Sequence, residues 1–230
     1  MSDVSKDDCS ERRNRINLKR IDGHYVLQEI RSVVSFEKGF LFTLKELATN
    51  PGESVKEFLN KDRKRLVKPI VFLIFTSLIY SVLNSLLSFE GDYMKFSGEN
   101  DSAVLTIFEW IQGNYGYTNI VMAIFIGFWT KLFFRKYRFN IFEILVLLCF
   151  VMGFGMLIFS IFGILEAITS NNIMQIAGIV GFVYTTWAIG QFYGKRKTIN
   201  YIKAFFAYTL GMLTFAISAI LIGTAIDLLL

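Results

Sequence analysis

The sequence predicts an all-α polytopic membrane protein, with five transmembrane helices and short cytoplasmic amphipathic helices. Residues 70–89 form an apolar run without a single charged residue. A helix of this length covers about 30 Å, which matches the hydrocarbon thickness of a bilayer. Of the 230 residues, 53% are hydrophobic, and they are segregated into long runs instead of being spread among polar residues. The loops between these runs differ in charge, which predicts an orientation in the membrane.

Three regions follow one another along the chain. Residues 1–20 are charged and lack apolar periodicity, which predicts a mobile tail. Residues 21–68 predict a cytoplasmic amphipathic and basic platform, whose last helix starts where Asn50 and Pro51 form a capping sequence. Helices this short are not stable alone, so we expect the platform to lie on the membrane surface or to pack under the helix bundle. Residues 69–230 form the membrane part.

The membrane part contains five apolar runs. They predict spans at about 70–89, 118–134, 141–168, 173–193 and 204–230. The second run is the weakest because Lys131 lies near its end, and an alternative with four spans would make this segment re-entrant. The outer loop, 90–117, carries five acidic residues and one lysine. It also contains an amphipathic stretch with Trp110, which predicts a short interfacial helix.

Basic residues gather on one side of this arrangement. The N-terminal segment and the loops 131–140 and 194–203 are rich in lysine and arginine, whereas the outer loop is acidic. The positive-inside rule therefore places the N-terminus in the cytoplasm and the C-terminus outside. We expect a multi-pass protein of the bacterial inner membrane.

The basic run before the first span is the first candidate site. Its cations are Lys61, Arg63, Lys64, Arg65 and Lys68. We expect them to contact anionic headgroups or a protein partner, at about 1 kcal/mol per cation near the membrane surface. Cations that flank a span are the ordinary orientation signal, so we expect no nucleic-acid partner.

Polar residues inside the apolar runs are the second candidate site. Intramembrane ionisable groups are functional candidates by default, and Glu143 is placed to pair with Arg138 or Lys131. Gln175 and Gln191 would either line a polar path or hydrogen-bond across helices. Because the charged residues all lie near a predicted interface, snorkelling towards the headgroups also explains them.

The sequence contains few residues of the types that act in catalysis. His24 is the only histidine, and the two cysteines, Cys9 and Cys149, lie in regions of opposite character. We therefore expect no enzyme activity, no metal and no cofactor. The spacing from Gly190 to Gly194 and from Ala219 to Gly223 predicts close helix contacts inside the bundle or between copies.

The stretch from His24 to Phe75 resembles the signature of an uncharacterised bacterial membrane family, domain of unknown function 3667. Its members carry a Lys-Gly-Phe-x-x-Thr-Leu-Lys-Glu-Leu-x-x-x-Pro-Gly block and then a Lys-x-Arg-x-x-x-x-Lys-Pro block. The matching positions are Lys38, Gly39, Thr43, Leu44, Pro51, Gly52, Arg63, Lys68 and Pro69. Tyr193-Gly194 with Lys203 is similar to the family's final cytoplasmic loop.

This chain departs from the family pattern in two respects. Members often begin with a zinc ribbon of two Cys-x-x-Cys motifs, and here only Cys9 is present. Members also often have histidines in the third span, where this chain has none. The resemblance therefore implies neither a zinc module nor a borrowed role in metal or proton handling.

Three functions remain in consideration. The first is a structural or regulatory inner-membrane protein that binds anionic lipid or a protein partner through its cytoplasmic platform. The alternative is a small oligomeric transporter, channel or membrane-permeabilising effector, which would need polar residues such as Gln175 and Gln191 to meet at a shared axis. A lipid-handling enzyme ranks third, because its acidic residues are scattered.

Overall fold

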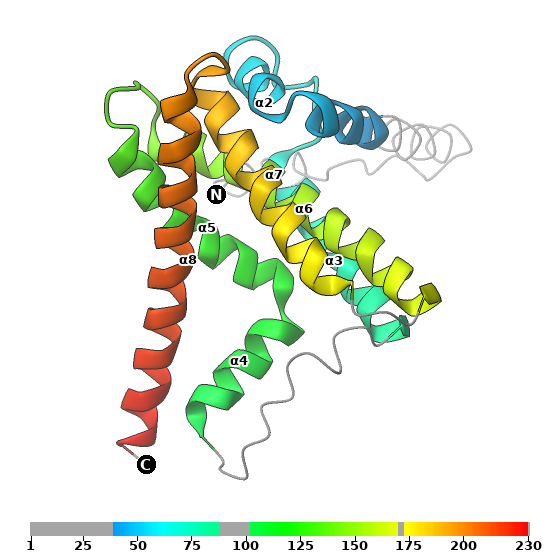
Figure 1. Ribbon diagram of the computed structural model, residues 1–230, viewed down its shortest axis with the longest axis vertical. Helices are drawn as coiled ribbons and strands as arrows, with labels where there is room; N and C mark the ends of the chain where they lie inside the picture. Colours follow the sequence, from blue (N-terminus) through cyan, green and yellow to red (C-terminus); the bar gives the residue numbers. More distant parts are fainter. Residues whose placement is uncertain (1–38, 88–101, 170–172, 230) are drawn as a thin grey trace, which may run out of the picture. The chain divides into compact units, whose positions relative to one another are not determined.

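The computed structural model describes residues 39–87, 102–169 and 173–229. Within these residues the backbone is helical with short connections, and it contains no strand (Figure 1). A helical segment over residues 39–49 is followed by α2 (Pro51–Asn60), α3 (Pro69–Leu87), α4 (Ala103–Gly113), α5 (Tyr115–Phe133), α6 (Ile141–Thr169), α7 (Met174–Gly194) and α8 (Thr198–Asp227). The predicted tail 1–20, residues 21–38 of the predicted platform, residues 90–101 of the outer loop and the turn 170–172 lie outside the described residues.

Four of the described helices are long and apolar enough to cross a membrane, namely α3, α5, α6 and α8. Their outward faces carry exposed large apolar side chains such as Leu78, Phe128 and Ile220, as lipid contact requires. Among these four, α5 has the lowest mean hydropathy, 1.2. The fourth predicted span, 173–193, corresponds to α7, a helix of 21 residues that is not among these four.

The last helix begins earlier than its apolar run predicts. We expected the span at about 204, but α8 starts at Thr198, so the second basic loop is shorter than predicted and Lys203 lies in a helix. The reason is Asn200, which is buried and exchanges hydrogen bonds with Tyr137 at 3.2 and 3.0 Å. A polar side chain with a partner of this kind is stable inside a helix contact.

A short helix, α4, forms where the sequence predicts an interfacial helix. Its N-cap residue is Ser102, whose hydroxyl accepts a hydrogen bond from the Val104 backbone N–H. Only Asn114 separates α4 from α5, and the two helices meet at a bend (Figure 1). The indole of Trp110 is 54% exposed, so it is available to an interface.

Small residues let the helices pack closely. A Cβ on Gly211 of α8 would lie 2.6 Å from the Ile126 Cα of α5, and one on Gly190 of α7 would lie 2.5 Å from the ring of Tyr201. On Gly223 it would lie 2.6 Å from Val104 in α4. The predicted small-residue contacts at Gly190 and Gly223 are therefore confirmed within the bundle. Helix α6 is central, because it contacts α2, α3, α5 and α7.

Candidate functional site

The candidate site is the end of the bundle where the basic segments lie, and Thr43 is its first anchor. Thr43 is fully buried, and its hydroxyl donates to the Gly39 carbonyl at 2.8 Å. The same oxygen accepts the Val67 backbone N–H at 3.1 Å. One side chain therefore fixes the helical segment 39–49 against the chain that leads into α3.

A network of ion pairs holds the basic run in place. Arg65 donates to Glu46 at 2.8 Å and also pairs with Glu57, which in turn pairs with Lys61 at 2.9 Å. The Ser54 hydroxyl donates to Glu46 at 2.7 Å, so that carboxylate has two partners. The hydrogen bond and charge of Lys61, followed by the charge of Arg65, hold the pKa of Glu57 below its usual range. Two of the five candidate cations are thus used internally.

Helix α2 is docked onto the end of α7. The Gly52 backbone N–H donates to the buried side chain of Gln191 at 2.8 Å. A Cβ on Gly52 would lie 2.2 Å from the Phe192 backbone nitrogen and 2.7 Å from the Ala188 carbonyl oxygen. Only glycine fits so close to another backbone. The Pro-Gly pair of the motif is therefore a docking element, in addition to a helix start.

Further contacts extend this docking to both sides of Gly52. The Tyr184 hydroxyl donates to the Leu47 carbonyl at 3.0 Å, and Lys195 donates to the Asn50 side chain at 3.3 Å. Asn50 is the N-cap residue of α2, but its side chain makes no capping hydrogen bond. On the α6 side, the rings of Phe58 and Phe150 meet edge to face at 5.4 Å. The described part of the platform therefore packs against α6 and α7, which is one of the two arrangements that the sequence predicts.

The other two basic loops join the same end. Phe134 of the loop after α5 stacks on Tyr193 at the end of α7, with ring centroids 3.7 Å apart. Phe139 of that loop contacts Phe192 at 4.5 Å. Together with the Tyr137–Asn200 pair, these contacts bring three basic segments that are far apart in the sequence to one end of the bundle.

We call this surface the basic end and define it by nine exposed cations: Arg63, Lys64, Lys68, Arg135, Lys136, Arg138, Lys195, Arg196 and Lys197. None of the nine forms an ion pair with another residue of the described ranges 39–87, 102–169 and 173–229. Of the five cations predicted before the first span, the structure thus leaves Arg63, Lys64 and Lys68 available, while Lys61 and Arg65 are paired. Unpaired cations at one surface attract anions.

The acidic residues near the helix ends cap other segments. Glu143 accepts the Asn140 backbone N–H at 2.6 Å, while the Asn140 side chain accepts the Phe142 N–H at 3.2 Å. This is a capping box at the start of α6, and the Asn-x-x-Glu spacing could have predicted it. Glu143 makes no ion pair with Lys131 or Arg138; instead Lys131 donates to the Phe139 carbonyl at 2.5 Å.

Two acidic residues near the other end of the bundle also cap the starts of helices. Glu166 accepts the backbone N–H groups of Ile173 and Met174 at 2.9 and 2.8 Å, at the start of α7. Asp227, in the last turn of α8, accepts from the Ser102 hydroxyl at 2.9 Å and from the Ala103 N–H at 2.6 Å, at the start of α4. A carboxylate at a helix N-terminus satisfies unpaired N–H groups and complements the helix dipole.

Within one chain, the three residues of the predicted intramembrane polar site are not all brought together. Gln175 is exposed near the start of α7, and Gln191 is buried near its end. Sixteen residues separate them, which is about 24 Å along a helix. Glu143 lies at the basic end with Gln191, but each has a structural partner of its own. Among the described residues, no group of three His, Cys, Asp or Glu could hold a metal ion.

Residues 37–81 match the family described as protein of unknown function (DUF3667). This agrees with the resemblance that the motif residues indicate. The matched segment contains the Thr43, Glu46 and Gly52 contacts, so the most recognisable part of the sequence is the part that docks the platform. No curated protein and no solved structure matches the chain.

Proposed function

We propose that this chain is a structural or regulatory protein of the bacterial inner membrane, and that its basic end faces the cytoplasm and binds anionic lipid headgroups or an acidic protein partner. The observation that carries the proposal is the set of nine exposed cations, contributed by three separate segments and unpaired within the described residues. At about 1 kcal/mol per cation near an anionic surface, a few of them suffice for a marked preference.

In this proposal α7 also crosses the membrane, which makes five spans in all. Its 21 residues cover about 31 Å, and it packs between α6 and α8. With five spans, α3 leaves the basic end, α5 returns to it, α6 leaves, α7 returns and α8 leaves. The N-terminus is then cytoplasmic and the C-terminus lies outside, in accordance with the positive-inside rule. Labelling of single cysteines at positions 136, 196 and 228 with an impermeant reagent on intact cells tests this topology.

Docking gives the proposed surface a fixed geometry. The ion pairs of Arg65 and the contact between Gly52 and Gln191 hold the basic run 61–68 beside the other two basic loops. Arg65 itself is two-thirds buried and engaged with carboxylates, so we assign it to positioning, and assign headgroup contact to Arg63, Lys64 and Lys68. A rigid array of charges binds an anionic surface with less loss of side-chain freedom than a flexible one.

The experiment compares lipid retention by the purified full-length protein in mixed micelles of phosphatidylglycerol and phosphatidylcholine. We expect phosphatidylglycerol to be retained several-fold over phosphatidylcholine, and the preference to fall as salt rises. The triple variant Arg63→Gln, Lys64→Gln, Lys68→Gln should lose most of this preference. The control variant Lys61→Gln removes a cation that is already paired with Glu57, so it should retain the preference for phosphatidylglycerol. Equal retention of both lipids, or an unchanged preference in the triple variant, would count against lipid binding.

An oligomeric transporter or channel is the alternative. It gains no specific support, because Gln175 and Gln191 lie at opposite ends of one helix and Gln191 is engaged with Gly52. Weighing the particle in a nanodisc and recording ion flux after reconstitution separates the two. A ring-like oligomer with flux would favour the alternative over the structural role.

A further inference from the structure

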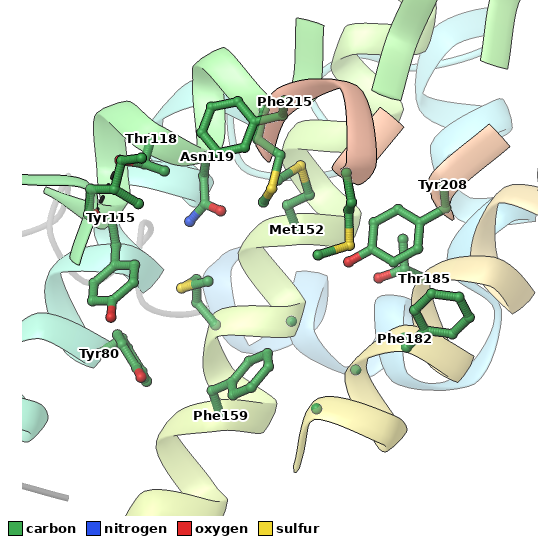
Figure 2. A pocket seen from close by; sticks show the side chains of 17 residues that line it. Tyr80, Tyr115, Thr118, Asn119, Met152, Phe159, Phe182, Thr185, Tyr208 and Phe215 are labelled. Atoms are coloured by element: carbon green, nitrogen blue, oxygen red, sulfur yellow. Dashed lines mark hydrogen bonds between the residues drawn. The ribbon is translucent and has the colours of Figure 1, made fainter. Parts of the chain in front are cut away.

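A cavity of about 400 Å³ extends from the middle of the bundle towards the end opposite the basic end. Its walls come from six helices, α3 to α8, and include Tyr80, Asn119, Met152, Phe182 and Tyr208 (Figure 2). The volume is within the range of pockets that hold small organic ligands. The cavity is partly open, and four of the six helices around it, α3, α5, α6 and α8, are long and apolar enough to cross a membrane. Lipid is therefore its natural surrounding.

The lining is apolar and adaptable. Four of the seven methionines in the chain, Met122, Met152, Met156 and Met212, line this one cavity. Methionine is flexible and polarisable, and it is favoured where a surface accommodates hydrocarbon of varied shape. Among the described lining residues there is no Asp, Glu, Lys, Arg or His. Such a lining favours a neutral occupant.

Glycines keep the cavity open. Gly155 of α6 and Gly178 of α7 line it, and a Cβ on either would meet nothing within 4 Å. Glycine inside a helix costs about 1 kcal/mol relative to alanine, and here no neighbouring atom requires it. The empty volume at these two positions is thus not a consequence of close helix packing.

One polar side chain points into this apolar space without a partner. Asn119 is 2% exposed, its amide nitrogen has no hydrogen-bond partner, and its side chain is directed into the cavity (Figure 2). Leaving a buried donor unpaired costs about 1–3 kcal/mol. The Thr118 hydroxyl, by contrast, donates to the Ile111 carbonyl at 3.1 Å, and the hydroxyls of Thr185 and Tyr208 point toward each other. Asn119 is therefore the polar group that a ligand would satisfy.

From this geometry we infer that the cavity binds a neutral amphiphile taken from the membrane, with its hydrocarbon chain against the methionines and a hydrogen-bond acceptor such as an ester carbonyl at the Asn119 amide. Asn119 lies one turn inside α5, about 6 Å from its start. At this depth an ester group is near the membrane interface while its chain reaches the bundle interior. The inference is independent of the basic end, because the two sites share no residue.

The test uses the full-length protein in nanodiscs with a monoacylglycerol that carries a photoreactive diazirine on its acyl chain. We expect adducts on peptides that contain Met152, Phe182 or Met212, and competition by unlabelled monoacylglycerol. Asn119→Leu should lower this labelling roughly 5- to 10-fold, as the loss of one hydrogen bond predicts. Gly178→Leu fills the cavity and should abolish it.

Thr130→Val is the matched control. Thr130 lies on the same helix as Asn119, is fully buried and also has an unpartnered polar atom, but it does not line the cavity. Its replacement should leave labelling unchanged. Labelling spread evenly over the outer faces, or labelling that Asn119→Leu does not reduce, would overturn the inference. Equal loss in Thr130→Val would also overturn it. Asn119→Leu replaces the unpaired amide with an apolar side chain that has the same number of heavy atoms, so this variant still tests the inference if Gly178→Leu fails to fold.

Discussion

At the basic end a methyl group on Gly52 would lie 2.2 Å from the backbone of α7, whereas in the cavity a methyl group on Gly155 would touch nothing within 4 Å. Both residues are glycines on helices of one chain. The first is small because two backbones meet there, and the second adjoins empty space. The difference indicates that α2 is attached rigidly at the basic end, whereas the cavity has room for an occupant.

Gly52→Ala is the change with the largest expected effect. The added Cβ would meet the backbone atoms of Ala188 and Phe192, which cannot move aside as a side chain can. We expect a loss of about 3 kcal/mol or more in the free energy of unfolding, measured by denaturation in mixed micelles. Gly113→Ala is the control, because its Cβ would meet nothing within 4 Å. Similar stabilities for the two variants would mean that α2 is not docked in this way.

Gln191→Leu tests the same attachment through its hydrogen bond. It leaves the buried Gly52 N–H without its acceptor, so we expect a loss of about 2 kcal/mol. Gln175→Leu makes the identical chemical change at an exposed position of the same helix and should alter stability by less than about 0.5 kcal/mol. If both variants were neutral, and both changed ion flux, the two glutamines would belong to a pore.

Two neighbouring glycines of α6 should respond with opposite signs. Gly155→Ala should raise stability by about 0.5–1 kcal/mol, because it adds helix propensity beside open space. Gly153→Ala would place its Cβ 2.9 Å from the Phe72 ring and 3.0 Å from the Thr76 hydroxyl, so we expect a loss of about 1–2 kcal/mol. The same denaturation measurement compares them. A gain at Gly153 would show that α3 and α6 are packed less closely than described.

The smallest effect concerns the pH dependence of the Glu57 ion pairs. Lys61 and then Arg65 lower the pKa of Glu57, so its stabilising contribution is present above the pKa of the unfolded chain and is lost as the pH falls through the lower folded value. Glu57→Gln should therefore be less stable than the natural chain near pH 7. The difference should shrink once the pH falls below about 4. A thermal melt of both proteins across this range measures it, and a constant difference would exclude the ion pairs as its cause.

Length and hydropathy sufficed for much of this fold. The predicted spans at 70–89 and 141–168 agree with α3 and α6 to within two residues at each described end. The boundary at Thr198 could not be predicted from hydropathy, because Asn200 and Lys203 are polar and the partner of Asn200 is Tyr137, far away in the sequence. Local pattern does not reveal which polar residue of a span will find a partner.

The candidate sites also have features that the sequence predicts and features that depend on distant residues. Exposed cations beside the first span were predicted, but their sorting into paired Arg65 and unpaired Arg63 depends on Glu46 and Glu57 being brought together by folding. The cavity left no signal in the sequence beyond its methionines and glycines, since its walls come from six helices. The role of Glu143 could have been predicted, because its capping partner Asn140 is three residues away.

The hydrogen bond from Gly52 to Gln191 also has a consequence for the order of assembly. Its two residues are 139 positions apart, so at a synthesis rate of roughly 5–20 residues per second the acceptor is made about 7–28 s after the donor. During that interval α3, α5 and α6 emerge while the platform has no α7 to rest on. Docking can be completed only after four of the five proposed spans have been synthesised. A docked platform is therefore a marker of a chain whose insertion has passed that stage.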